Sequence, residues 1–213
     1  MSANQFGTVG IIGAGLIGAS LGLALKQAKV VHQMIGVGRS ASNLDQALKI
    51  GAIDRVADLA DAVRSSQWIV VCVPVAQMRA IFTQMEPHLG PNTLITDAGS
   101  TKCDVILAAK ETLGKKVCQF VPAHPIAGGA QHGAAAARAD LFQGKQTIIC
   151  QLQENSAADV TLVEQFWMTV GSKIKRISAV QHDAIYAAVS HLPHILSYAL
   201  MASVLNSEDA EQK

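Results

Sequence analysis

The sequence is poor in charged residues, and the two signs nearly cancel. Charged side chains make up 15% of the 213 residues, the net charge is +1, and half of the residues are hydrophobic. A nucleic-acid-binding surface needs an excess of Lys and Arg, and a disordered chain has fewer apolar residues, so the composition argues against both classes. The length allows one large domain, or one of ordinary size and part of a second. We therefore expect a globular protein with a sizeable core and no nucleic-acid partner.

Cysteine is also scarce, and the chain has no CxxC pair. Cys72, Cys103, Cys118 and Cys150 are widely spaced, which favours reduced structural thiols over a disulfide framework or a zinc site, so we expect no metal. The N-terminal MSANQFG has no basic segment before its apolar run, and glycines break that run. This pattern fits neither a signal peptide nor a membrane span, and we expect a cytoplasmic protein without a membrane partner.

The sequence is organised around Val9–Gly22, which reads VGIIGAGLIGASLG. A short apolar run suits a buried strand, and a GxGxxG turn follows it and opens an apolar helix, which is the context of a dinucleotide-binding turn. Unpaired N–H groups at such a helix start favour phosphate. The alternative is a glycine-rich turn that binds nothing, but the flanking strand and helix favour a cofactor. The expected cofactor-binding residues here are Gly13, Gly15, Leu16, Ile17 and Gly18.

The end of the second expected strand, residues 34–38, indicates which cofactor binds. In NAD-binding units an Asp or Glu about 20 residues beyond the glycine turn holds the ribose 2′-hydroxyl, and an Arg accommodates a 2′-phosphate. The corresponding position is Gly38, followed by Arg39 and Ser40. With no carboxylate to repel a phosphate, and a guanidinium and a hydroxyl to bind it, NADP is favoured over NAD. The alternative for Arg39 is a solvated surface arginine.

The remaining hydrophobic pattern alternates strands with helices as far as residue 177. We expect an α/β, Rossmann-type, doubly wound and mostly parallel sheet in residues 1–177, followed by the first helix of an all-helical domain in residues 178–213. Further strands are predicted at 53–57, 68–73, 93–96, 117–121, 146–150 and 172–177, and helices at 42–50, 59–64, 76–85, 102–113 and 157–170.

Three strand-end loops are expected at the carboxyl edge of the sheet, where ligands of open α/β sheets bind. The first carries Val73 and Pro74, expected to contact the cofactor. The second, 97–102, carries Ser100 and Lys102, a hydroxyl and a cation near the nicotinamide and substrate; Thr101 and Asp104 also fit a capping box. The third is a long loop rich in Gly and Ala with His124 at its root. His124 is either a packed residue or a catalytic one, and its place at this edge favours the catalytic role.

From Ser178 onward the pattern is helical. Ser178 and Gln181 match a capping box, and apolar residues recur at steps of three and four through 179–205. Pro193 predicts a bend, because it cannot donate to the carbonyl of Val189. His191 and His194 lie three apart, but no further ligand completes a metal site, so structural or substrate-binding roles are favoured. This helix is too apolar to lie alone on a surface, so it predicts a helical second domain or a subunit interface.

The chain resembles the prephenate and arogenate dehydrogenases of tyrosine biosynthesis over essentially its whole length. The resemblance rests on GAGLIGASLG, DAGSTK, HPIAGG and HDAIYAAVSHLPH, in this order; the last two are the more specific. It implies oxidative decarboxylation of a cyclohexadienol with hydride transfer to a nicotinamide, and a homodimer formed through C-terminal helices. By the same resemblance His124 binds the ring hydroxyl and accepts its proton, Ser100 orients the reacting groups, and His191, Gly128 and Gly129 contact the substrate.

Two features depart from the family pattern. Members often have Glu six residues after the histidine of the HP motif, where this chain has Ala130, so any gating by that charge is absent. The family's arginine for the substrate's side-chain carboxylate lies beyond the position of Lys213 and is assigned to no residue here; we expect only the start of the helical domain in this sequence. Two other hypotheses stay open: another NADP-dependent enzyme with a helical second domain, of the β-hydroxyacid or imine reductase type, and a cofactor-binding module without activity.

Overall fold

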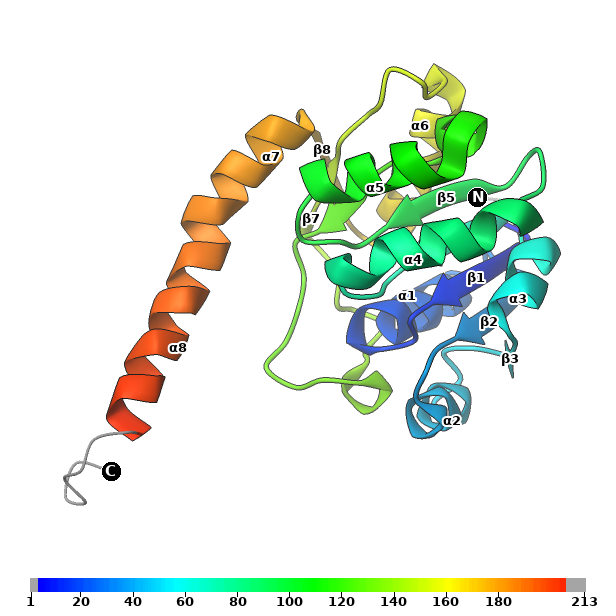
Figure 1. Ribbon diagram of the computed structural model, residues 1–213. Helices are drawn as coiled ribbons and strands as arrows, with labels where there is room; N and C mark the ends of the chain where they lie inside the picture. Colours follow the sequence, from blue (N-terminus) through cyan, green and yellow to red (C-terminus); the bar gives the residue numbers. More distant parts are fainter. Residues whose placement is uncertain (1–3, 206–213) are drawn as a thin grey trace.

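The computed structural model describes residues 4–205, which form a layered α/β body and a long projecting helix (Figure 1). The body contains a parallel sheet of five strands in the order β3-β2-β1-β4-β5. The strands are β1 (Thr8–Ile12), β2 (Gln33–Val37), β3 (Arg55–Val56), β4 (Trp68–Val71) and β5 (Leu94–Asp97). With β1 between β2 and β4, strands β2 and β3 are added on one side of β1 and β4 and β5 on the other, and such folds bind their ligands at this switch in strand order.

Helices cover both faces of this sheet, because successive side chains of a strand point to opposite sides. Ile11 and Val70 pack in one core with α1 and α6, while Ile12 and Ile69 pack in the other with α4 and α5. The expected Rossmann-type fold is therefore confirmed. The helices are α1 (Leu16–Gln27), α2 (Ala41–Lys49), α3 (Leu59–Ser65), α4 (Val75–Met85), α5 (Cys103–Leu113) and α6 (Ala157–Thr169), with 3-10 turns at Glu86–His88, Gly114–Gln119 and Ala134–Ala136.

The later strands form a second, three-stranded sheet instead of extending the first. It consists of β6 (Ala123–Pro125), antiparallel to β7 (Gln146–Ile149), which is parallel to β8 (Lys173–Arg176). The strand predicted at 117–121 was wrong: most of it is the 3-10 turn, and one bridge joins Phe120 to Ile95 of β5. Buried Val117 and Phe120 are three residues apart, which matches the period of a 3-10 helix.

The C-terminal segment is helical from Ala179 to Leu205, as predicted. It comprises α7 (Ala179–Tyr186), a π-helical turn (Ala187–His191) and α8 (Leu192–Leu205). The capping box of Ser178 and Gln181 is confirmed. The π-helical turn ends two residues before Pro193, which removes one backbone donor.

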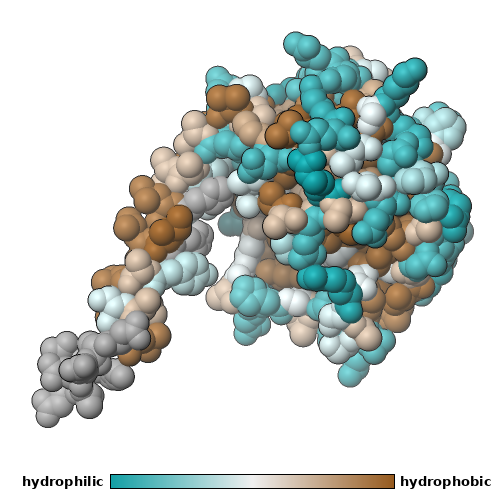
Figure 2. All heavy atoms as spheres, in the orientation of Figure 1, coloured by the Kyte–Doolittle hydropathy of each residue, from teal (hydrophilic) through white to brown (hydrophobic). Residues whose placement is uncertain are grey.

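Large apolar side chains lie exposed along this projecting helix, as Figure 2 shows. They are Val180, Ile185, Val189, Leu192, Ile195, Leu196, Tyr198, Leu200, Met201, Val204 and Leu205. Among the described residues, one helix is long and apolar enough to cross a bilayer, judged by length and composition alone, and it is this segment. So much exposed apolar surface predicts that another structure covers it.

Candidate functional site

The turn between β1 and α1 has the geometry that the GxGxxG spacing predicts. Gly13 has φ +100°, and a Cβ there would lie 2.7 Å from the Cys72 carbonyl oxygen. A Cβ on Gly18 would lie 2.4 Å from the Gly13 carbonyl oxygen, so only glycine lets α1 pack this close to the turn. In front of Gly15 the space is open, which leaves room for a ligand against the backbone. Gly22, one turn further along α1, lies against the backbone of Ala52, whose carbonyl oxygen would be 2.1 Å from a Cβ there.

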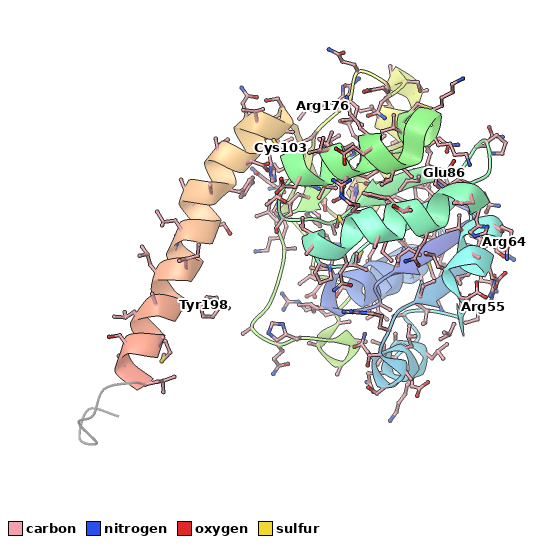
Figure 3. The ribbon with its side chains drawn as sticks, in the orientation of Figure 1. Arg55, Arg64, Glu86, Cys103, Arg176 and Tyr198 are labelled. Atoms are coloured by element: carbon pink, nitrogen blue, oxygen red, sulfur yellow. The ribbon has the colours of Figure 1, made fainter. Side chains whose placement is uncertain are left out.

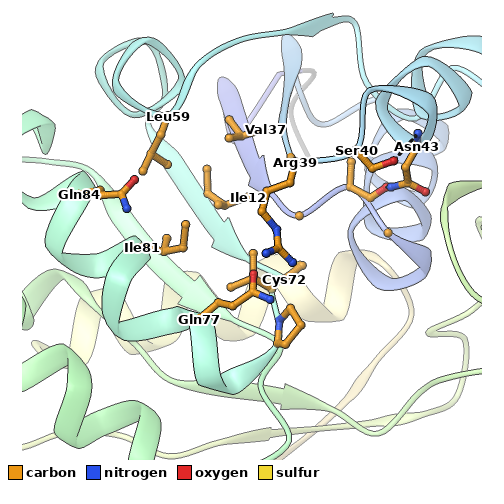
Figure 4. A pocket seen from close by; sticks show the side chains of 16 residues that line it. Ile12, Val37, Arg39, Ser40, Asn43, Leu59, Cys72, Gln77, Ile81 and Gln84 are labelled. Atoms are coloured by element: carbon orange, nitrogen blue, oxygen red, sulfur yellow. Dashed lines mark hydrogen bonds between the residues drawn. The ribbon is translucent and has the colours of Figure 1, made fainter.

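A cavity of about 410 Å³ begins at this turn and extends beside the end of β2. Figure 4 shows its walls, in which Arg39 points inward toward Gln77. Of the described residues that line it, Arg39 is the only charged one, and none is an acid. Ser40 caps α2, accepting a hydrogen bond from Asn43 N–H at 3.3 Å. Gly38, Arg39 and Ser40 are all exposed, so each is accessible to a ligand.

A second cavity, of about 480 Å³, lies on the other side of the turn. It shares Gly15, Cys72, Val73 and Pro74 with the first cavity, and it brings together expected residues from four separate loops. The residues that line it include Leu16, Ile17, Val73, Pro74, Ser100, Gly128, Gly129 and His132. The first two begin α1, whose N-terminal N–H groups and dipole favour an anion.

A third cavity, of about 390 Å³, contains His124 and lies between the loop after β6 and the projecting helix. It shares Ala127 and Gly128 with the second cavity, and its far wall is formed by Tyr186, Val189 and Ser190. The three cavities therefore succeed one another from Arg39, past Ser100, to His124. Such a continuous series of cavities suits an extended dinucleotide, with a second small molecule at the His124 end.

His124 is half-buried, and its imidazole contacts another histidine. Nδ1 of His124 lies 2.8 Å from Nε2 of His182, and Nδ1 of His182 lies 2.7 Å from a carboxylate oxygen of Asp183. His182 is fully buried, and Tyr186 packs edge-on against His124 with ring centroids 5.4 Å apart. His124 is therefore packed against its neighbours and at the same time lines a cavity, and its expected catalytic role stays a prediction.

Lys102 does not lie in the cavities, contrary to expectation. It is fully buried, and its ammonium group donates to Asp97 at 2.5 Å and to the Ala123 carbonyl at 2.7 Å. Asp97 also accepts from Ala123 N–H at 2.9 Å, so this ion pair joins the end of β5 to β6. Burying an ammonium is costly unless it is paired and hydrogen-bonded, and these two partners offset that cost.

The capping box predicted for Thr101 and Asp104 is also wrong. Helix α5 begins at Cys103, and the N–H groups of Lys102 and Cys103 donate to Asp183 at 2.7 and 2.8 Å. A carboxylate from α7 therefore takes the place of a local cap. Figure 3 shows Cys103 at this end of α5, beside α7.

The long loop after β6 is held by a residue that sequence reasoning missed. Asn43 donates to the Ala14 carbonyl at 2.6 Å and accepts from Ala134 N–H at 2.7 Å, so it ties the loop to the glycine turn. The hydroxyl of Ser20, in α1, accepts from Arg138 N–H at 3.0 Å. An Asn in the first turn of an expected helix carried no signal that could have identified this contact.

The four cysteines are free thiols, and no group of three or more potential metal ligands occurs among the described side chains. Burial raises the pKa of Cys72 and Cys150, the latter to about 12, so both stay protonated near neutral pH. The side chain of His191 lies outside the described residues, and its expected contact with the substrate stays a prediction.

Comparison with known proteins gives a consistent result along the chain. Residues 21–176 match the family model for the nucleotide-binding domain of prephenate dehydrogenase, and residues 178–213 match the model for its dimerization domain. A curated relative, the cyclohexadienyl dehydrogenase of Zymomonas mobilis, is 34% identical over 95% of this chain and 69% of its own length. Other curated relatives are longer, and the chain spans about half of their length.

Solved structures similar to this chain include enzymes with the same kind of name. Prephenate dehydrogenase from Aquifex aeolicus, in complex with hydroxyphenyl propionate and NAD+, superposes with a TM-score of 0.88 and 27% identity, covering 96% of this chain and 71% of that one. Synechocystis arogenate dehydrogenase has a TM-score of 0.80, also with 27% identity and with the same coverage of both chains.

Proposed function

Because the chain belongs to the prephenate dehydrogenase family, we propose that it catalyses the oxidative decarboxylation of prephenate or arogenate in tyrosine biosynthesis, with NADP as the oxidant. The observation that carries this proposal is the place of His124. Its cavity adjoins the one at the start of α1, so an imidazole lies where a nicotinamide and a small ring can meet.

The residues along the cavities fit a dinucleotide. Gly13 allows the turn, Gly18 lets α1 pack against it, and the open space at Gly15 would let a pyrophosphate approach the backbone. The free N–H groups of Leu16 and Ile17, at the start of α1, would hold that pyrophosphate. Val73 and Pro74 form the wall shared by the two halves of the cofactor site. When bound, the nicotinamide supplies an acceptor for the hydride that leaves the ring carbinol.

His124 supplies the base for this reaction. A neutral imidazole accepts the proton of the ring hydroxyl, so the carbon–oxygen bond gains carbonyl character while the hydride leaves. The bond to the ring carboxylate then breaks, CO2 departs, and its electron pair completes the aromatic ring. The ring oxygen regains the proton, so proton and electrons balance. In this proposal Ser100 orients the hydroxyl, and Gly128, Gly129 and His191 contact the substrate.

The choice of NADP rests on the first cavity. No carboxylate among its described residues is available to bind a ribose diol, whereas Arg39 points into it and Ser40 lies beside it. A guanidinium and a hydroxyl are suitable donors to a 2′-phosphate. The Aquifex relative was solved with NAD+, so titration of this chain with both cofactors is the direct test.

We predict that Gly38→Asp moves the preference toward NAD. A Cβ at Gly38 approaches no atom closer than 3.4 Å, at Leu44, so the side chain fits; its charge would repel a 2′-phosphate. The ratio of kcat/KM for NADP to that for NAD should fall about ten-fold or more, and Gly38→Asn, which has the same size and no charge, should change it little. Tight NAD and weak NADP binding by the unaltered chain would contradict the assignment.

Steady-state rates with both substrates and both cofactors test the activity itself. CO2 release with prephenate or arogenate supports this function over the β-hydroxyacid and imine reductase alternatives. If NADP binds and neither substrate is turned over, the chain acts as a cofactor-binding module, and the proposed activity is wrong for it.

We also propose that a second copy covers the exposed apolar side chains of α7 and α8, which gives a cytoplasmic homodimer. The match of residues 178–213 to a dimerization domain supports this explanation over insertion into a membrane.

Leu196→Glu should therefore shift the protein from dimer to monomer in sedimentation without detergent. Leu196 is 59% exposed on α8, and a carboxylate there would be costly to bury against a partner. The matched control is Leu162→Glu, at a leucine 40% exposed on α6. A monomer in the unaltered protein, or a chain recovered only with membranes, would refute the dimer.

A further inference from the structure

Two adjacent residues of α7, His182 and Asp183, contact both loops that carry the proposed catalytic residues. His182 contacts His124 at 2.8 Å, on β6. Asp183 accepts from the N–H groups of Lys102 and Cys103, which directly follow the loop that holds Ser100. A single turn of helix therefore fixes the position of α7 against both loops at once.

Asp183 is ionised in this position. Burial acts to raise its pKa, but hydrogen bonds from Cys103 N–H, from His182 and from Lys102 N–H outweigh burial and lower the pKa to about 2. The N–H groups at the start of α5 also favour a negative charge. Since a carboxylate only accepts hydrogen bonds, the neighbouring Nδ1 of His182 must carry a proton and donate it.

His182 is held neutral. Its burial lowers its pKa and opposes the effect of Asp183, so near neutral pH it carries one proton only. With that proton on Nδ1, Nε2 of His182 is an acceptor, and Nδ1 of His124 must be the donor across the 2.8 Å contact. Neutral His124 then has its lone pair on Nε2.

The other described titratable side chains that contact or surround these rings do not reverse this order. Tyr186, whose ring lies 4.7 Å from that of His182, has its pKa raised by burial and stays neutral. Burial also raises the pKa of Cys103, to about 11. Lys102 and Asp97 are engaged with each other.

We propose that His182 and Asp183 are positioning residues that keep the proton of neutral His124 on Nδ1 and its lone pair on Nε2, the nitrogen that accepts the substrate's proton. This inference rests on the proposed function for its purpose, but the tautomer is a property of the protein alone. It also makes the base depend on the docking of α7 against α5, because without that contact His124 loses His182 as an acceptor for its Nδ1 proton.

The decisive test is nitrogen NMR of the full chain with 15N-labelled histidine, at a pH where His124 is neutral. The His124 signals are assigned by their loss in His124→Asn. We expect a protonated Nδ1 and an unprotonated Nε2; a proton on Nε2 would overturn the proposal. This measurement needs no turnover, so the expected tautomer without any CO2 release would contradict the proposed function alone.

Kinetics of His182→Gln provide a second test. We expect kcat to fall about 100-fold with little change in KM, because the base is misaligned while the binding surfaces remain. The exposed His32 provides the matched control, and His32→Gln should leave kcat unchanged. An unchanged kcat and pH profile in His182→Gln would refute the positioning role, and the spectrum of the unaltered chain decides the tautomer even if this variant fails to fold.

Discussion

Replacing His124 by asparagine should lower kcat about 1,000-fold while NADP binding stays nearly intact. A positioned general base contributes about 10²- to 10⁴-fold to a rate, and asparagine has no basic nitrogen. The residue lines the third cavity only, whereas the expected contacts of the cofactor lie along the first two. The measurement is kcat with saturating prephenate and arogenate, together with a calorimetric titration of NADP.

His32→Asn is the control for this substitution, because it removes an exposed histidine that lines none of the three cavities. It should leave both rate and binding unchanged. If His124→Asn retains full turnover, His124 has no catalytic role. If it loses NADP binding to the same degree as turnover, the histidine instead supports the cofactor site.

The parts of the fold that follow from neighbouring residues could be predicted from the sequence. A buried apolar strand, a glycine turn and an apolar helix follow one another without interruption, and the steric needs of Gly13 and Gly18 are met within one turn of chain. The same holds for the capping box at Ser178, whose two partners are three residues apart. The place of Ser100, in the loop after β5, also follows from the strand that precedes it, whereas His124 was expected after a strand at 117–121 and lies instead in β6 of the second sheet.

The parts that depend on distant residues could not be predicted. Thr101 and Asp104 have the spacing of a local cap, but the N–H groups at the start of α5 bind Asp183, about eighty residues further along. The position of Lys102 after a strand predicts a cation in the site, but its ammonium is buried between Asp97 and the Ala123 carbonyl. In both cases the sequence specifies a polar group and its chemistry, and only the tertiary fold decides which partner satisfies it.

Replacing Lys102 by methionine should destabilise the protein by about 3–5 kcal/mol, the usual cost of leaving one partner of a buried ion pair uncompensated. Both side chains are fully buried, and methionine keeps most of the length of lysine without its charge. Asp97 would keep its bonds from Gly99 N–H and Ala123 N–H but lose the ammonium. Urea unfolding, followed by circular dichroism, measures the change in the free energy of unfolding.

Two further variants show whether the lost stability comes from the buried charge. Adding Asp97→Asn to Lys102→Met should restore part of the stability, since it removes the unpaired charge. Lys110→Met, which breaks the exposed pair with Glu154, should cost much less. Equal losses of stability at Lys102 and Lys110 would show that the buried charge is not the cause.

The same ammonium also binds the Ala123 carbonyl, next to His124. Lys102→Met should therefore lower kcat even where the protein remains folded, because the base is displaced from the end of β5.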